Sequence, residues 1–132
     1  PQAEYDAWLA EQKQAAALER ELTAKEWTLA ELMARGEGVY ASACASCHQP
    51  NGQGLPPTFP SLVGSDLVLN DLQAHINTVV NGVRGTSMAA FGSQLSEVDI
   101  AAVITYERNA WGNDTDDLVT PLQILEFKQA QE

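Results

Sequence analysis

The chain has 132 residues, 45% of them apolar and 19% charged, which is the size and composition of about one globular domain. Eighteen acidic against seven basic residues give a formal net charge of −11, which argues against nucleic acid and anionic lipid headgroups as ligands because both need basic patches. No apolar run approaches the roughly 18 residues of a membrane-spanning helix, so no transmembrane segment is expected in this chain. The negative surface either is simply well solvated or steers a basic partner toward the domain.

The first part of the chain, residues 1–35, has no Gly or Pro between Gln2 and Arg35 and is rich in Ala, Glu, Gln and Lys, a helix-forming composition. The stretch before Thr28 is weakly amphipathic and is predicted to be an extended helical arm or linker. Thr28 is expected to cap a further helix, with Glu31 closing a capping box. The chain begins with neither an initiator Met nor a signal peptide, and we expect it to be a processed or excised part of a longer protein.

Residues 36–112 are predicted to form the compact domain. A short helix over 36–43 leads into the cysteines, and the segment 49–66 carries four of the six prolines, which predicts an ordered loop. Asn70 is expected to cap the next helix, which Gly82 ends. The apolar face of that helix consists of Leu72, Ile76, Val79 and Val80.

A second irregular segment is followed by the last helix of this domain. Ser96 is expected to cap it, Asp99 to complete a capping box and Gly112 to end it. Residues 113–132 begin with the acidic connector "NDTDD" and continue, from Thr120 and Pro121, as a short terminal helix. No alternating β pattern is long enough for a sheet, so the predicted fold is all-α with long ordered loops.

The segment Cys44-Ala45-Ser46-Cys47-His48 matches C-x-x-C-H, the signature for covalent attachment of c-type haem. Two thiols one helical turn apart can each form a thioether to one vinyl group of the porphyrin. The imidazole of the next residue, His48, then points at the iron. The sequence therefore predicts one haem c, held by Cys44 and Cys47, with His48 as its proximal iron ligand.

Three other uses of this motif are less well supported. A disulfide between residues 44 and 47 would be strained and would close only a tiny loop. A thioredoxin-like dithiol needs a preceding strand, whereas this motif follows a predicted helix. A zinc site would need His48 and His75 as further ligands, and these lie 27 residues apart instead of the usual three to five.

The second axial ligand decides between electron transfer and chemistry on a bound molecule. Met88 is favoured because it lies in a Gly-rich loop that can approach the haem, whereas Met33 is expected to pack in its helix. His75 is expected to be exposed, and bis-His ligation is the alternative. A His48–Met88 pair raises the reduction potential and leaves no open position, as in a one-electron carrier. The predicted apolar crevice consists of Phe59, Leu62, Val79, Phe91 and Val103.

Residues 36–112 resemble the class I cytochromes c. The resemblance rests on "GEGVYASACASCH", "FPSL", "NGVRGTSM" and the helix that contains Tyr106. It implies that the Pro60 carbonyl accepts a hydrogen bond from the His48 ring, and that Arg84 faces a haem propionate unless it is merely an exposed loop charge. It also implies that Gly36 lets the first helix cross the last closely, with Tyr40 and Tyr106 at the contact.

The ends of the chain carry a closer resemblance. "EYDAWLAEQ" is similar to the segment after the last copper ligand in subunit II of bacterial cytochrome c oxidases. "WTLAELMARGEGVYASACASCHQPNGQGLPPTFPSLVGS" and "ITYERNAWGN" are similar to the cytochrome c domain fused to that subunit in caa3-type enzymes. The copper-binding residues of the family's preceding domain are absent from this sequence, and the strong negative charge departs from the lysine-rich docking ring of mitochondrial cytochromes c.

This resemblance implies an electron relay that performs no bond chemistry by itself and is therefore no enzyme alone. An external donor, a cytochrome or another small redox protein, would reduce the haem, and the electron would pass to the dinuclear copper domain of the same subunit. Residues 1–35 would be the linker after that copper domain, on the periplasmic side of the bacterial plasma membrane. The alternatives are a free-standing periplasmic class I cytochrome c and, in another class, a haem enzyme or gas sensor with Met88 unbound.

Overall fold

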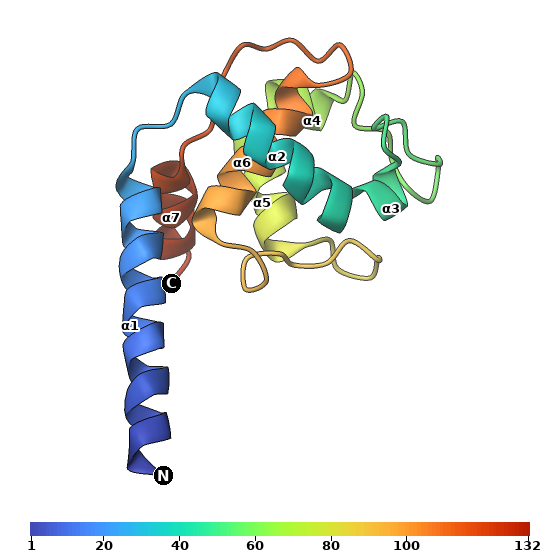
Figure 1. The fold of residues 1–132 in the computed structure, drawn as a ribbon. Coiled ribbons are helices and arrows are strands. Elements are labelled where there is room, and N and C mark those ends of the chain that lie inside the picture. Colours follow the sequence, from blue (N-terminus) through green and yellow to red (C-terminus); the bar gives the residue numbers. More distant parts are fainter.

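The computed structural model describes residues 1–132 and contains seven α-helices and no β-strand, which confirms the predicted all-α class. The long first helix projects from a body formed by the other helices (Figure 1). None of the helices combines the length and the apolarity needed to span a bilayer. In chain order the helices are α1 Gln2–Ala24, α2 Leu29–Ala43, α3 Ala45–His48, α4 Asp66–Asn70, α5 Leu72–Asn81, α6 Glu97–Asn109 and α7 Pro121–Ala130.

The helix α2 begins at the predicted capping box. The Glu31 N–H donates to Thr28 Oγ1 at 3.2 Å, and the Thr28 N–H donates to Glu31 Oε1 at 2.9 Å. The helix then runs without a break to Ala43, so the predicted short helix over 36–43 is its C-terminal half. Two internal glycines do not end it, because backbone hydrogen bonds and packing against α6 outweigh their low helix propensity.

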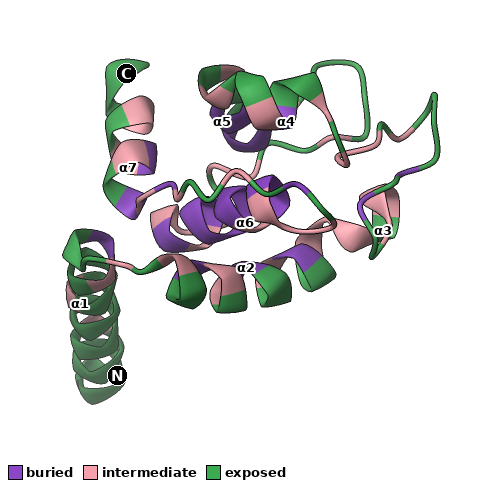
Figure 2. Cartoon of the chain, turned by 90° about the horizontal axis from the view of Figure 1, so that it is seen from above, coloured by how far each residue is buried: buried purple, intermediate pink, exposed green.

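The core of the protein forms where α2 crosses α6. Gly36 lies against the Ala102 carbonyl, where a side chain would collide, and the rings of Tyr40 and Tyr106 pack 5.5 Å apart, as predicted. Figure 2 shows α6 as the most continuously buried helix, between α2 and the other helices. Its buried apolar residues are Val98, Ile100, Ala101, Ala102, Val103 and Ile104. The last helix of the domain is therefore its central element.

The segment 65–82 differs from the prediction at its start. Asn70 does not cap a helix; it is the last residue of α4, and its side chain donates to Asp66 Oδ1 at 2.7 Å. Asp71 caps α5 instead, because its carboxylate accepts the Ala74 N–H at 3.1 Å. Gly82 ends α5 with a φ of 71°, as predicted.

The ends of α6 follow the prediction in part. Ser96 caps the helix and accepts the Asp99 N–H at 3.1 Å. The Asp99 side chain does not close a capping box; its carboxylate accepts from Arg35 Nε of α2 at 2.7 Å, because the crossing helix brings a cation to it. The helix ends at Asn109, earlier than Gly112.

The helical arm predicted before Thr28 is α1. Thr23 is its only buried residue, and only α6 and α7 contact it (Figure 1). The helix α7 begins at the predicted Thr120, whose side chain accepts the Gln123 N–H at 3.2 Å, and it packs against α6. The helices α1 and α7 therefore lie side by side on the side of the body away from α3, and the N-terminus lies at the free end of α1 (Figure 1).

Candidate haem site

The short helix α3 presents the C-x-x-C-H motif in a single turn. The N–H groups of Cys47 and His48 both donate to the Cys44 carbonyl, at 3.2 Å and 3.0 Å. Both cysteines are half-buried free thiols. This turn begins where α2 ends, so the packing of α2 against α6 fixes the position of the motif on the core. The structure thus presents two thiols and an imidazole within one turn of helix.

The chemistry of Cys44 disfavours the metal and disulfide alternatives. Burial raises the pKa of the Cys44 thiol to about 12, with smaller contributions from the negative charges of Glu107 and Cys47. The thiolate is the form that binds zinc and exchanges disulfides, and this environment disfavours it. No group of three or more His, Cys, Asp or Glu side chains is arranged to hold a metal ion.

The His48 ring is held through one of its two nitrogens. Nδ1 lies 2.9 Å from the Pro60 carbonyl oxygen, the contact that the resemblance predicts. A carbonyl only accepts, so Nδ1 carries the proton and Nε2 of the neutral ring has a free lone pair. The same loop is tied back to α3 because the Gly54 N–H donates to the His48 carbonyl at 2.8 Å. This arrangement leaves Nε2 available as a ligand.

Met88 lies in the loop between α5 and α6. The Val83 N–H donates to the Met88 carbonyl at 3.1 Å, and the Met88 N–H donates to Thr86 Oγ1 at 3.1 Å. Gly82 lies so close to the Met88 carbonyl that a side chain there would collide with it. A ring of backbone contacts therefore positions Met88, and its half-buried side chain packs against the core.

The structure brings most of the predicted crevice together. Cys44, Leu62, Met88 and Phe91 pack, partly buried, against one core cluster that contains the buried Val79 and Val103. Two thiols, an imidazole nitrogen and a thioether beside apolar side chains are a donor set that fits haem c.

Phe59 and Arg84, which are predicted to contact the haem, lie outside this cluster. Phe59 is half-buried, and its N–H and carbonyl exchange hydrogen bonds with the backbone of Leu55, at 3.0 Å and 2.8 Å. Arg84 is exposed and takes part in no hydrogen bond or ion pair with another protein group. Its arrangement matches the alternative of an exposed loop charge, and a role toward a propionate stays a prediction.

The prediction that His75 is exposed is wrong. The residue is 2% exposed, and its Nε2 lies 2.8 Å from Glu107 Oε1 in α6. The apolar stripe of α5 predicts an exposed side chain at this position, but α6 presents a buried carboxylate opposite it. Its Nε2 is engaged by Glu107 and is therefore not available as a ligand in the bis-His or zinc alternative.

Sequence reasoning also missed two side chains that hold the loop after the motif. Trp111 Nε1 donates to the Pro50 carbonyl at 3.0 Å, and its ring packs edge-on against Tyr40. The buried Asn113 accepts the Gly64 N–H at 2.9 Å and donates to the Leu62 carbonyl at 2.9 Å. Each contact spans about fifty residues or more, so no local pattern could have signalled it.

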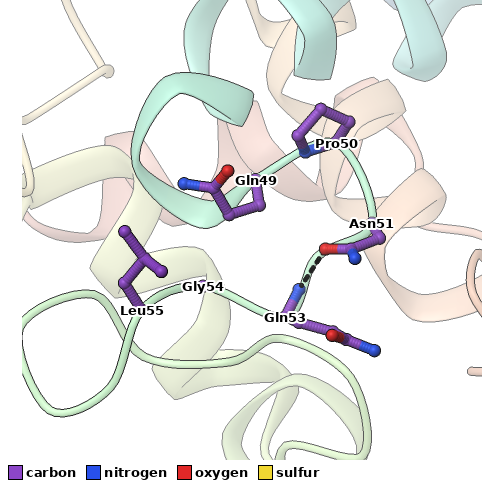
Figure 3. A pocket seen from close by; sticks show the side chains of 6 residues that line it. All are labelled: Gln49, Pro50, Asn51, Gln53, Gly54 and Leu55. Atoms are coloured by element: carbon purple, nitrogen blue, oxygen red, sulfur yellow. Dashed lines mark hydrogen bonds between the residues drawn. The ribbon is translucent and has the colours of Figure 1, made fainter.

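A surface hollow lies on the loop that follows α3, but it is not the site. Figure 3 shows its side chains around one turn of backbone, where the Gln53 N–H donates to Asn51 Oδ1 at 3.1 Å. It contains no thiol, imidazole or charged group. The residues that line it are Gln49, Pro50, Asn51, Gln53, Gly54 and Leu55.

The helical fold, the C-x-x-C-H turn on α3 and the apolar cluster beside it define a class I cytochrome c domain that carries one haem c, joined covalently through Cys44 and Cys47. Residues 31–106 match the family described as cytochrome c oxidase, cbb3-type, subunit III, and the chain belongs to this family. It is therefore an electron-transfer domain.

Several relatives share part of this chain. Cytochrome c-552 of Thermus thermophilus is 35% identical over 100 residues, which cover 64% of this chain and 66% of the relative. The cytochrome c subunit of a quinone alcohol dehydrogenase from Gluconobacter oxydans is 28% identical over 70% of this chain and 22% of the relative. The cbb3-type oxidase subunit FixP of Azorhizobium caulinodans is 37% identical over 61% of this chain and 30% of the relative. This chain thus spans about two thirds of the first relative and under one third of the other two.

Proposed function

We propose that the domain is a one-electron relay in which Nε2 of His48 and the thioether sulfur of Met88 would hold the haem iron. Bound haem c supplies the one-electron iron couple. The observation that carries this proposal is the Nδ1 contact of His48 with Pro60, which leaves Nε2 free to bind. A thioether opposite an imidazole raises the potential and closes the sixth position to oxygen and peroxide. The residues therefore suit electron transfer better than catalysis or gas sensing.

The apolar side chains beside the site are expected to stabilise the reduced state and to keep reorganisation on electron transfer small. Leu62 and Phe91 pack over the core at the site, and Val79 and Val103 lie buried beneath them. Such side chains exclude water and do not reorient when a charge changes nearby. A dry and rigid surrounding favours the less charged, reduced state and keeps the reorganisation on electron transfer small.

More specifically, we infer that this domain belongs to subunit II of a caa3-type oxidase and passes electrons to the dinuclear copper centre of that subunit. The support is the resemblance of "EYDAWLAEQ" to the segment after the copper ligands, together with the largely exposed helix α1, which suits a tether. A short tether makes the transfer intramolecular, with an effective concentration in the millimolar range. The contact with the copper domain can therefore be weak, which permits rapid release.

The surface beside the motif suits such a weak contact. The segment 43–65 contains no Asp, Glu, Lys or Arg, and the segment 82–96 contains only Arg84, although the whole chain has a net charge of −11. Two apolar side chains in these segments are open to solvent: Leu55 is 58% exposed and Val83 is 44% exposed. The proposed docking face therefore carries Arg84 as its only charged side chain, and its partner surface should also be poor in charge.

The location follows from the cofactor, because haem c is attached outside the cytoplasm. We place the domain on the periplasmic side of the bacterial plasma membrane, where an external donor would reduce it. A free-standing periplasmic cytochrome c is the second candidate, and the similarity to cytochrome c-552 favours it.

Electron transfer between purified domains tests the relay. The reduced holo-domain is mixed with the oxidised dinuclear-copper domain of a caa3-type subunit II in a stopped-flow instrument. We expect bleaching of the copper absorption together with oxidation of the haem. Val83→Glu, which puts a charge on the docking face, should slow the transfer, whereas Leu67→Glu on α4 makes the same charge change at a 38% exposed side chain elsewhere and should not. A copper centre that stays oxidised, or equal slowing by both variants, would contradict the proposal.

A further inference from the structure

The buried pair of His75 and Glu107 is not used by the relay described above. The two side chains come from α5 and α6, are 3% and 6% exposed, and join through Nε2 and Oε1 at 2.8 Å. Taking ionisable groups out of water is unfavourable unless they are well paired, and an apolar pair of similar size would pack here at least as well. A buried acid and base between two core helices therefore call for an explanation beyond packing.

The hydrogen bonds of the pair show where a proton can be added. An ionised carboxylate only accepts, so Nε2 of His75 donates to Glu107 and carries the proton of the neutral ring. The other nitrogen, Nδ1, has no hydrogen-bond partner and is buried. Nδ1 is therefore the free basic atom of the pair, and a proton added there converts the pair to an imidazolium and a carboxylate.

The charge of Glu107 reaches the place where the haem is attached. Besides burial, the negative Glu107 contributes to the raised pKa of the Cys44 thiol, and it acts on the Tyr40 hydroxyl in the same direction. The packing also joins the pair to the haem site. Asn113 donates both to the Glu107 carbonyl and to the Leu62 carbonyl of the crevice, each at 2.9 Å. Ile76, next to His75, lies in the core cluster against which Cys44 packs. Such a coupling is reciprocal, so a charge change at a group carried by Cys44 would alter the proton affinity of the pair.

The groups around Glu107 supply no positive charge that pairs with its carboxylate. Tyr40 of α2 and Cys44, the residue that follows this helix, lie near Glu107, and both are uncharged in their ordinary forms. The neighbouring Arg108 directs its guanidinium to the Val68 carbonyl at 2.6 Å and to Asp117 at 3.1 Å.

The remaining neighbours supply no positive charge. Asn113 donates to the main-chain carbonyl of Glu107 at 2.9 Å. On α5, the carboxylate of Asp71 is exposed and caps its own helix through the Ala74 N–H. The buried carboxylate of Glu107 is therefore matched only by His75.

We propose that the His75–Glu107 pair is a proton-binding site coupled to the oxidation state of the domain. When an electron enters, the loss of positive charge favours a proton at the pair, and His75 Nδ1 takes one proton from water. When the electron leaves, the pair returns that proton to water. One electron and one proton thus move together, and the net charge of the buried region stays constant. This inference rests on the proposed one-electron relay.

The reduction potential as a function of pH tests this coupling. Spectroelectrochemical titrations of the holo-domain between about pH 5 and 9, which brackets the range where histidine titrates, should show a potential that falls as pH rises. A tenfold difference in proton affinity between the two oxidation states corresponds to about 59 mV between the acid and alkaline plateaus. Glu107→Gln and His75→Gln should each reduce this difference. Asp99→Asn makes the same charge change as Glu107→Gln, on the same helix but in the pair with Arg35, and should retain it.

A second measurement keeps the test decisive if a variant fails to fold. NMR titration of the His75 ring in the wild-type domain should give a midpoint at higher pH in the reduced state than in the oxidised state. Equal midpoints in both states, or unchanged pH profiles in folded variants of the pair, would overturn the inference. Neither measurement needs a copper partner or Met88 ligation, so failure here is separable from failure of the proposed relay.

Discussion

Gly36 of α2 lies directly against the main-chain carbonyl of Ala102 in α6, and a Cβ at this position would also come within 2.7 Å of Tyr106 Cβ. Gly38, two residues later in the same helix, has nothing within 4 Å of the corresponding position. The two glycines therefore have opposite roles in one helix. The first permits the helix crossing that positions α3, and the second only weakens α2.

This difference predicts opposite effects of the same substitution. Gly36→Ala should lower the free energy of unfolding by about 1–3 kcal/mol, because the helices must separate to admit the methyl group. Gly38→Ala should raise it by about 0.5–1 kcal/mol, because alanine has the higher helix propensity. Urea denaturation followed by circular dichroism measures both. Equal effects of the two substitutions would show that the close crossing does not limit stability.

Trp111 is predicted to stabilise the loop that follows the motif. Trp111→Phe removes the hydrogen bond to the Pro50 carbonyl but keeps an aromatic ring against Tyr40. We expect the free energy of unfolding to fall by about 1 kcal/mol, the usual contribution of one hydrogen bond. Trp8→Phe on α1 is the control, because the Trp8 side chain is 54% exposed and its replacement should leave stability unchanged. A loss of similar size in both variants would contradict a specific role of the Pro50 contact.

The capping box at the start of α2 predicts a dependence on acid. The hydrogen bond from Lys25, followed by those from the Thr28 backbone and side chain, lowers the pKa of Glu31 from 4.5 to about 2. A lowered pKa in the folded state means that this carboxylate stabilises the protein above about pH 4.5 and that its contribution is lost as pH falls toward 2. Glu31→Gln should therefore be less stable than wild type near neutral pH, and the difference should vanish near pH 2. Thermal unfolding at a series of pH values measures it, and a difference independent of pH would refute the assignment.

Met88→Ala tests the second axial ligand. Removing the thioether should abolish the weak far-red absorption band that a sulfur–iron bond gives in the oxidised protein, and it should lower the reduction potential. The emptied position should also let the reduced domain bind carbon monoxide. Met33→Ala is the matched control, because Met33 lies in α2 and should affect neither property. Retention of the band in Met88→Ala would assign the ligand elsewhere.

The local features of this protein could be predicted from the sequence. The capping box at Thr28, the start of α7 at Thr120, the end of α5 at Gly82 and the C-x-x-C-H turn each depend on residues within about four positions of one another. Their hydrogen bonds close within one turn of backbone, so the residue types and their spacing are sufficient to specify them. The all-α fold and the attachment of haem c follow from these short patterns.

The tertiary structure alone decided which polar side chains are buried and with what they pair. His75 pairs with Glu107, 32 residues later in the sequence. Arg35 pairs with Asp99, 64 residues later, so the Asp99 carboxylate does not close the predicted capping box. The periodicity of a helix shows which side of it is apolar but not what the neighbouring helix presents to the remaining positions. Burial of a charge depends on its partner, and the partner is selected by how α2, α5 and α6 pack together.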